Sequence, residues 1–205
     1  KLLEDFGIQT SGAKKITSKE DAIKAYHQLD VPVALKTAES HISHKTEVNG
    51  VHLNLRTVTE VADAYADLAN RLGPVASIAP MITDGVEMSL GILGDRQFGP
   101  MVLISAGGTM IEIFSDRRLS PTPLDERTAL NMIETLGTRP LLDEHRGRPA
   151  VDIHAFAKTA VKLGTLADVL GDLISELDIN PLTVTPNGAY ALDALLVLHS
   201  HYDTN

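Results

Sequence analysis

The chain has 205 residues, with 18 Lys and Arg against 27 Asp and Glu, so its net charge is −9. This acidic balance argues against a protein that coats nucleic acid or anionic membrane, but it leaves room for a locally basic site that binds a small anion. Hydrophobic residues make up 43% of the chain, which is typical of a globular protein with a buried core. The absence of cysteine excludes disulfides and thiolate chemistry and is compatible with a cytoplasmic location.

Residues 1–80 are predicted to form a first lobe in which helices and strands alternate. The spacing of a capping box at 18–21 predicts a helix that ends near Leu29, and a second capping box at 57–60 predicts another that ends at Gly73. Short apolar or alternating segments predict strands over 31–36 and 51–55. Because the chain starts at Lys1 rather than Met, we expect it to be part of a longer cytosolic protein.

Residues 81–205 are predicted to form a second lobe built around an antiparallel meander. Short apolar runs that alternate with turn residues predict strands over 75–81, which leads into the meander, and over 86–93, 101–106 and 110–114. Helices are expected over 124–136 and 152–170, and two last strands over 175–185 and 189–194, joined by a turn that contains Asn187-Gly188. The whole is an α+β chain in two lobes, and its apolar runs are too short to span a bilayer.

Two segments of the first lobe bear side chains suited to phosphate chemistry. Lys36 ends an apolar strand, where it could bind phosphate as a point charge, or simply extend its ammonium group into solvent. The loop 40–50 holds two histidines, a lysine and hydroxyl groups, so it could cradle phosphate and let a histidine accept a phosphoryl group. A metal pair of His41 and His44 and a plain polar surface loop are the alternatives.

Two segments of the second lobe bear candidate residues as well. Gly107-Gly108 could let the backbone approach a phosphate closely, although a tight hairpin turn explains it equally well. Alternation along 175–185 places Glu176, Asp178 and Asn180 on one face of an otherwise apolar strand, and we expect Asp193 on the neighbouring hairpin strand. Asn180 with Asp193 is an oxygen pair suited to Mg²⁺, whereas the alternative is a solvent-facing sheet surface.

These segments together resemble the ATP-grasp domains of NDP-forming acyl-CoA synthetases, relatives of the succinyl-CoA synthetase beta subunit. The resemblance covers nearly the whole chain and lies in the following stretches: Val33-Ala34-Leu35-Lys36, 42–51, 97–100, Gly107-Gly108, 123–125, 146–149, 176–182 and 192–194. It implies the ATP-grasp fold, with a nucleotide held between two α+β lobes. The implied reaction is acyl-CoA + ADP + phosphate ⇌ carboxylate + CoA + ATP, with acyl phosphate and phosphohistidine as intermediates.

The resemblance also implies roles for single residues. His44 matches the histidine that relays the phosphoryl group to ADP in the ADP-forming acetyl-CoA synthetases, and Asp178 matches a carboxylate that orients a phosphohistidine. The residues implied to bind nucleotide are Lys36, the hinge Ala79-Pro80-Met81, Glu87, Gly107 and Gly108. Asn180 and Asp193 are implied to hold Mg²⁺. Asn49 stands where many relatives have Gly, and because Asn tolerates a left-handed backbone we expect the loop to keep its shape.

Partners follow from the same resemblance. The domain is expected to be inactive without CoA-binding and CoA-ligase parts, present in the same chain or as an alpha subunit, and to involve neither nucleic acid nor membrane. A second hypothesis is a regulatory nucleotide-binding module fused to a protein acetyltransferase domain. A third is another ATP-grasp ligase, such as a carboxylate–amine ligase, against which the His44 loop argues because those enzymes need no relay histidine.

Overall fold

The computed structural model describes residues 1–42, 45–95, 97–108, 116–145 and 147–199. They form two compact units, a larger one of Lys1–Thr10 with Thr83–Asn205 and a smaller one of Ser11–Ile82. The sequence predicted lobes of 1–80 and 81–205, whereas the structure groups the first ten residues with the larger unit. The reason is physical: Ile8 is buried in the core of that unit, and the Ala191 amide donates a hydrogen bond to the Gln9 carbonyl over 2.9 Å.

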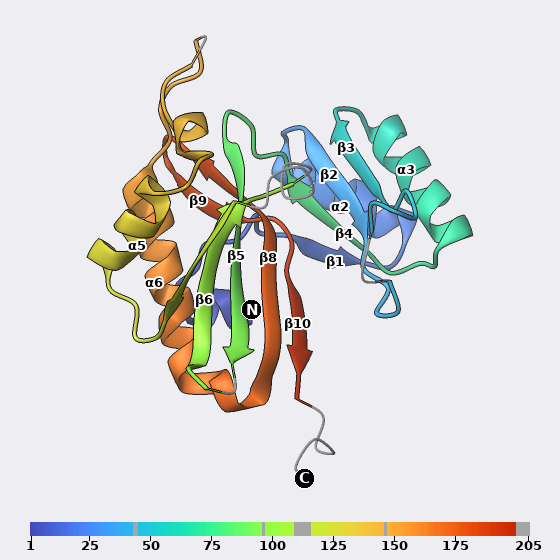
Figure 1. Ribbon diagram of the computed structural model, residues 1–205. Coiled ribbons are helices and arrows are strands. Elements are labelled where there is room, and N and C mark those ends of the chain that lie inside the picture. Colours follow the sequence, from blue (N-terminus) through green and yellow to red (C-terminus); the bar gives the residue numbers. More distant parts are fainter. Residues whose placement is uncertain (43–44, 96, 109–115, 146, 200–205) are drawn as a thin grey trace. The chain divides into compact units, whose positions relative to one another are not determined.

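The smaller unit is a four-stranded antiparallel sheet covered on one face by two helices (Figure 1). Its elements are β1 (Lys14–Ile16), α2 (Lys19–Leu29), β2 (Val33–Thr37), β3 (Val51–Leu55), α3 (Val58–Arg71) and β4 (Ala76–Pro80). The strand order is β1-β4-β2-β3. Alternate residues of β2 and β4, among them Leu35 and Ile78, pack with Ala64 and Leu68 of α3 in one core. The residues between them, such as Lys36, therefore lie on the face that the helices leave open.

Both predicted helices of this unit begin where their capping residues stand. The Ser18 hydroxyl accepts a hydrogen bond from the Asp21 amide at the start of α2. At the start of α3 the capping box is complete, since Thr57 Oγ1 accepts from the Glu60 amide and the Glu60 carboxylate accepts from the Thr57 amide. Backbone donors of the first turn that would otherwise lack partners are satisfied in this way.

The larger unit is a six-stranded antiparallel sheet packed against helices on one face. Its elements are α1 (Leu2–Asp5), β5 (Val86–Asp95), β6 (Gly99–Ala106), β7 (Arg117–Pro121), α5 (Glu126–Glu134), the 3-10 helix η1 (Arg139–Leu142), α6 (Ile153–Leu170), the 3-10 helix η2 (Gly171–Leu173), β8 (Ile174–Thr185), β9 (Gly188–Ala191) and β10 (Leu195–Leu198). The order is β10-β8-β5-β6-β7, and β9 pairs with the same edge of β8 as β10. Phe156 and Leu163 of α6 are fully buried against Leu90 and Ile104 of the sheet.

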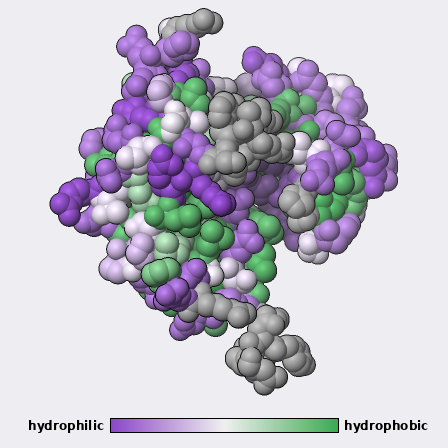
Figure 2. Space-filling model, in the orientation of Figure 1, coloured by the Kyte–Doolittle hydropathy of each residue, from purple (hydrophilic) through white to green (hydrophobic). Residues whose placement is uncertain are grey.

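The opposite face of this sheet carries no described helix of the larger unit and is partly apolar. Leu119, Leu195 and Val197 are about 40% exposed on it, at 44%, 39% and 41%. Figure 2 shows hydrophobic side chains gathered on this face over β6, β5 and β10.

Four strands differ from the sequence prediction, among them β10, which was not predicted. β7 and β1 were not predicted either, because each is a short edge strand with a single apolar side chain other than proline and so lacks an apolar alternation. The predicted strand 189–194 is wrong in its extent, since β9 ends at Ala191 and the chain then starts β10. The predicted strand 110–114 lies outside the described residues.

The two predicted helices of the second lobe are confirmed, with Asp125 and Asp152 as N-caps that accept hydrogen bonds from Thr128 and Ala155 amides. No helix in the described part of the chain has the length and apolar character needed to cross a membrane.

The capping box of α3 gives a direct stability prediction. Thr57→Ala removes the hydroxyl acceptor and leaves the Glu60 amide without its partner, so it should lower the free energy of unfolding by about 1 kcal/mol. Thr59→Ala is the matched control, because Thr59 is an exposed residue of the same helical turn and its loss should change stability by less than about 0.5 kcal/mol. Urea denaturation of the three proteins measures both values, and equal destabilisation by the two variants would contradict the prediction.

Candidate functional site

Lys36 and the predicted hinge lie on neighbouring strands of the smaller unit. In the register of β2 and β4, Lys36 pairs with Ser77, and Ala34 pairs with Ala79. Lys36 is partly buried on the open face of the sheet, and Ala79 is 8% exposed. Met81 follows β4 and its amide donates to the Pro32 carbonyl over 2.8 Å, so 79–81 is a continuation of the sheet that ends just before the boundary between the units at 82 and 83.

The loop that carries the predicted relay histidine is described over 40–42 and again from Lys45 onward, and His44 itself lies outside the described residues. The Gly50 amide donates to the Lys45 carbonyl over 2.7 Å, and Asn49 has a φ of 50°. Asn49 therefore has the left-handed backbone that asparagine tolerates. A Cβ at Gly50 would lie 2.7 Å from Thr37 Cγ2 and 2.9 Å from the Lys45 carbonyl oxygen, so only glycine fits there.

A bulge in β8 shapes the polar site of the larger unit. β5 pairs Met88 with Leu182 and Leu90 with Ile179, so the single residue Ser89 faces the two residues Asn180 and Pro181. The bulge keeps Ile179 and Leu182 both in the core although they are three positions apart. Asn180 consequently stays on the open face of the sheet. The alternation of buried and open positions along β8 shifts by one residue at the bulge, next to the polar side chains of Asp178 and Asn180.

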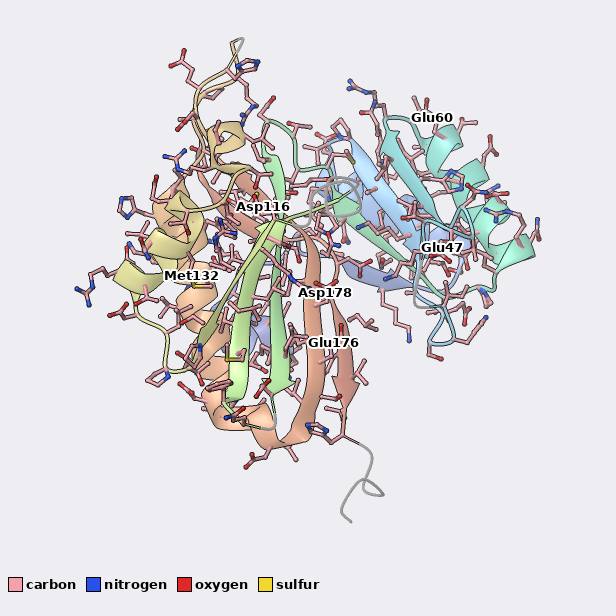
Figure 3. The ribbon with its side chains drawn as sticks, in the orientation of Figure 1. Glu47, Glu60, Asp116, Met132, Glu176 and Asp178 are labelled. Carbon is pink, nitrogen blue, oxygen red and sulfur yellow. The ribbon has the colours of Figure 1, made fainter. Side chains whose placement is uncertain are left out.

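Asp178 is the most perturbed acid of this face. Burial raises its pKa above the ordinary value, the charges of Glu176 and Asp193 raise it further, and a hydrogen bond from the Ser89 hydroxyl, 3.1 Å from Asp178 Oδ1, opposes these effects. Glu176 and Asp178 lie two residues apart on β8 (Figure 3). Ser89 is fully buried and was not singled out from the sequence, because a lone serine in an apolar strand gives no signal of the partner that pairing brings to it.

Gly107, Gly108, Glu87 and Asn180 meet beside this acid. The Gly107 amide donates to the Glu87 carbonyl over 3.0 Å, and the Gly108 amide donates to Asn180 Oδ1 over 3.0 Å. A Cβ at Gly107 would lie 2.2 Å from the Met88 carbonyl oxygen, and one at Gly108 would lie 1.9 Å from Glu87 Oε2. A close approach to β5 thus requires glycine at both positions, and the second glycine fixes the Asn180 amide through its hydrogen bond.

Asp193 lies near the same edge of β8, but not in the strand in which it was predicted. It was expected on the hairpin strand, but it lies in the short link between β9 and β10. The Leu192 amide donates to the Pro181 carbonyl and Leu195 pairs with Asp178, so the link passes Ile179 and Asn180 along the edge of β8. The charge of Asp193 contributes to the raised pKa of Asp178, after burial and the charge of Glu176.

The comparisons with known proteins agree with this geometry. Residues 1–198 match the family described as the ATP-grasp domain. The chain is an ATP-grasp domain. It is 33% identical to the beta subunit of acetate–CoA ligase (ADP-forming) I from Pyrococcus furiosus, over 96% of this chain and 88% of that one. This match shows that the chain belongs to the family of ADP-forming acyl-CoA synthetases, the family that its sequence resembles.

Two further relatives show how the domain occurs elsewhere. Acetate–CoA ligase (ADP-forming) II of Archaeoglobus fulgidus is 31% identical over 96% of this chain but only 29% of its own length. The acetyl-coenzyme A synthetase 1 of Ca. Korarchaeum cryptofilum, described as dinucleotide forming and crystallised with coenzyme A and Ca-AMPCP, superposes with a TM-score of 0.89. It is 31% identical over 96% of this chain and 89% of that one. The domain therefore occurs both as a separate subunit and within a longer chain.

The residues of the ATP-grasp domain fit the Mg²⁺ ion that the family implies. Asn180 Oδ1 accepts one hydrogen bond, from Gly108, and a carbonyl oxygen has a second lone pair for a cation. Burial raises the pKa of Asp178, and the neighbouring charges of Glu176 and Asp193 raise it further, so a bound cation would favour the ionised carboxylate. In the part of the chain that the structure describes, no group of three or more His, Asp or Glu side chains is placed to hold a metal ion. Magnesium bound with a nucleotide usually takes one or two protein oxygens and shares the phosphates as its other ligands.

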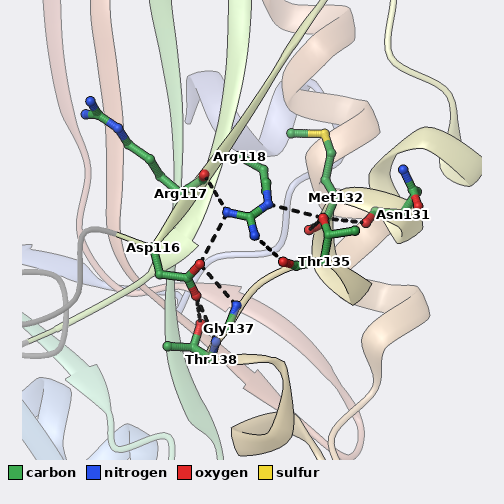
Figure 4. A network of polar contacts seen from close by, with 8 residues as sticks. All are labelled: Asp116, Arg117, Arg118, Asn131, Met132, Thr135, Gly137 and Thr138. Carbon is green, nitrogen blue, oxygen red and sulfur yellow. Dashed lines mark hydrogen bonds and ion pairs between the residues drawn. The ribbon is translucent and has the colours of Figure 1, made fainter.

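A second polar cluster of the ATP-grasp domain was missed from the sequence (Figure 4). Asp116 accepts hydrogen bonds from the amides of Gly137 and Thr138 and from the Thr138 hydroxyl, at 3.1, 2.8 and 2.7 Å. Arg118 lies 3.3 Å from Asp116 and also donates to Thr135 at the end of α5. These contacts fix β7 to the end of α5. Asp116 and Thr138 are 22 residues apart, so no local pattern could have joined them.

Asp178 gives a prediction in which the sign follows from its pKa. A raised pKa means that the fold favours the protonated acid, so this stabilisation is complete below the unfolded-state pKa of about 3.9 and is lost as the pH rises through the folded-state pKa. At pH 7 the ionised carboxylate opposes folding. Asp178→Asn should therefore raise the melting temperature of the domain, without nucleotide or Mg²⁺, by about 1–3 °C at pH 7 and by less near pH 3.

Thermal unfolding followed by circular dichroism at the two pH values measures this difference. Asp172→Asn is the control, since Asp172 is exposed in η2 and its substitution should leave the melting temperature within about 1 °C. A lower melting temperature of Asp178→Asn at pH 7 would show that the carboxylate stabilises the fold.

Proposed function

We propose that this ATP-grasp domain is the nucleotide-binding and phosphoryl-transferring part of an ADP-forming acyl-CoA synthetase, an acid–thiol ligase that interconverts acyl-CoA, ADP and phosphate with carboxylate, CoA and ATP. The observation that carries this proposal is the extent of the match to the Pyrococcus furiosus subunit, 96% of this chain and 88% of the relative. Such a match covers the domain from end to end rather than one nucleotide-binding motif, and each predicted site residue except His44 lies in a described part of it.

In the proposed site, charge neutralisation and positioning do most of the work, as phosphoryl transfer requires. Lys36 contributes a positive charge from a sheet face, and Asn180 with Asp193 holds Mg²⁺, which neutralises charge on the phosphates when bound. Glu87, Gly107 and Gly108 contact the nucleotide, and the backbone of Ala79, Pro80 and Met81 borders the adenine. The hydrogen bond from Gly108 to Asn180 supports this assignment, because it fixes the metal-binding amide beside the glycines.

His44 is the proposed carrier of the phosphoryl group. A ring nitrogen of the neutral imidazole bonds to the γ-phosphorus of ATP while the bond from that phosphorus to the β,γ-bridging oxygen breaks and ADP leaves; the proton on the other ring nitrogen stays. The resulting phosphoimidazolium returns its phosphoryl group to ADP by the reverse step. Asp178 is proposed to orient a phosphohistidine through the ring nitrogen that is not phosphorylated, which fixes the tautomer. Its carboxylate on the open face, held by Ser89, supports this role.

The partners are part of the proposal. CoA binding and the first phosphohistidine are assigned to CoA-binding and CoA-ligase parts, in the same chain or as an alpha subunit, because the relatives include both a beta subunit and a longer chain of which this domain spans 29%. A fused acetyltransferase with a regulatory nucleotide-binding domain is the second arrangement. It predicts nucleotide binding without phosphoryl transfer, and we propose a cytoplasmic enzyme in either case.

The relay role of His44 is tested in the complete synthetase. His44→Ala should lower formation of ATP from acetyl-CoA, ADP and phosphate by about 100-fold or more, because it removes the only group proposed to carry phosphoryl to the nucleotide. An acid-labile, base-stable ³²P label from γ-labelled ATP should be reduced in parallel. The measurements are coupled ATP formation and labelling with ³²P.

His41→Ala is the matched control for this experiment. His41 is an exposed histidine three residues earlier in the same loop, and its loss should change the rate by less than about threefold. Full activity of His44→Ala would sink the relay assignment. Tight binding of Mg-ATP by calorimetry in a wild-type protein that makes no ATP would instead favour the regulatory arrangement.

A further inference from the structure

We propose that Arg71, at the end of α3, is the positioning residue for the loop that carries His44. It holds the end of that loop through two backbone carbonyls and a carboxylate, and so sets where the loop can present its histidine. The inference rests on the proposed relay role of His44 and concerns residues of the smaller unit alone.

The guanidinium of Arg71 makes four described hydrogen bonds. Its Nε donates to Asp67 Oδ1 over 2.8 Å and its Nη2 to Asp67 Oδ2 over 2.6 Å, which is a two-point contact with the carboxylate one helical turn earlier. Its Nη1 donates to the Val48 carbonyl over 3.0 Å and its Nη2 to the Asn49 carbonyl over 2.9 Å. A planar fork can join a carboxylate to two consecutive carbonyls in this way, whereas the single ammonium of lysine cannot.

Asp67 is itself held on its other side. His52 Nε2 lies 2.9 Å from Asp67 Oδ2, and His52 stands in β3, the strand that begins directly after the loop. Hydrogen bonds from Arg71 and His52 hold the pKa of Asp67 well below its usual range. The carboxylate is therefore ionised at every pH at which the enzyme would work, so Arg71 always has its charged partner.

The carbonyls that Arg71 holds belong to a closed turn. The Asn49 amide donates to the Thr46 carbonyl over 3.1 Å, and the Gly50 amide donates to the Lys45 carbonyl over 2.7 Å. The Gly50 carbonyl then accepts from the Thr37 amide over 2.8 Å, and Thr37 directly follows Lys36. The turn is thus fixed between the strand that bears Lys36 and the helix that bears Arg71, and His44 is the residue that precedes it.

These contacts suit positioning more than stability. The side chains of Arg71 and Asp67 are 39% and 41% exposed, and ion pairs this exposed add little to the free energy of folding. Their geometry matters in a different way, because a displacement of about 1 Å between reacting groups can lower a rate by about 100-fold. All described hydrogen bonds of Arg71 go to Asp67 and the turn, so its loss should slow phosphoryl transfer and leave the affinity for nucleotide unchanged.

The test uses the complete synthetase and two separate readouts. In Arg71→Ala the single-turnover rate of ³²P transfer from γ-labelled Mg-ATP to the enzyme should fall 10- to 100-fold, while the Kd of Mg-ATP should change by less than twofold. Arg71→Lys keeps the charge without the fork and should give a smaller fall of about 3- to 10-fold. Asp67→Asn keeps the shape of the carboxylate but loosens Arg71, so it should also slow transfer.

Arg56→Ala is the matched control, since Arg56 is an exposed arginine of the same unit whose Nε contacts only the nearby Asn54 Oδ1 and which does not touch the turn in the described contacts. It should leave both readouts within twofold of wild type. If Arg71→Ala does not fold, Arg71→Lys and Asp67→Asn decide the matter, with circular dichroism as the check on folding.

Two results would overturn the inference. Wild-type rates in Arg71→Lys and Asp67→Asn, or a raised Kd for Mg-ATP with an unchanged transfer rate, would show that Arg71 does not position the loop. His44→Ala measured alongside separates the two proposals. Lost labelling in His44→Ala with normal transfer in the Arg71 variants leaves the relay intact and overturns only the positioning role, whereas normal labelling in His44→Ala overturns both.

Discussion

The larger unit depends on β8, whose two faces have opposite character. One face of this strand must bury Leu177, Ile179 and Leu182 against helices, while the other must present acids and an amide. Ile179 and Leu182 are three positions apart, so a regular strand would point them to opposite faces. The bulge opposite Ser89 brings both to the buried face. The polar site and the core are therefore set by the same irregularity in one strand.

This arrangement makes one carboxylate electrostatically unfavourable. Asp178 is partly desolvated beside two other carboxylates, which raises its pKa and makes its charged form unfavourable for folding. The hydrogen bond from the Ser89 hydroxyl offsets only part of this effect. A site that tolerates such a concentration of negative charge is suited to a cation and to the positive groups that accompany phosphoryl transfer. The net charge of −9 is thus compatible with a site for a polyanionic nucleotide.

The smaller unit holds an irregular loop, which ends at Gly50, against its regular sheet. Gly50 lets the turn pack against Thr37, Asn49 adopts a left-handed conformation, and Arg71 binds the carbonyls that the turn leaves without partners in β2 or β3. These interactions come from three elements that converge on one short turn. Lys36 and the loop thereby belong to one connected hydrogen-bonded structure, although eight residues separate Lys36 from His44.

The sequence by itself determined the family and most helices and strands, and it supplied the residues that are proposed for the site. Capping residues such as Thr57 and Asp152, apolar alternation in β5 and β8, and the stretches around Lys36 and Asn180 are local signals, because they depend on near neighbours in the chain. Tertiary structure alone decided that residues 1–10 join the larger unit, that Asp193 lies in a link rather than a strand, and that Gly107 is needed for an approach to β5. It also brought Ser89 to Asp178, Asp116 to Thr138 and Arg71 to Asn49. Each of these pairs is more than 20 residues apart in the chain, and the register of strands and the packing of helices that bring them together are set by burial of the whole core, which no local pattern encodes.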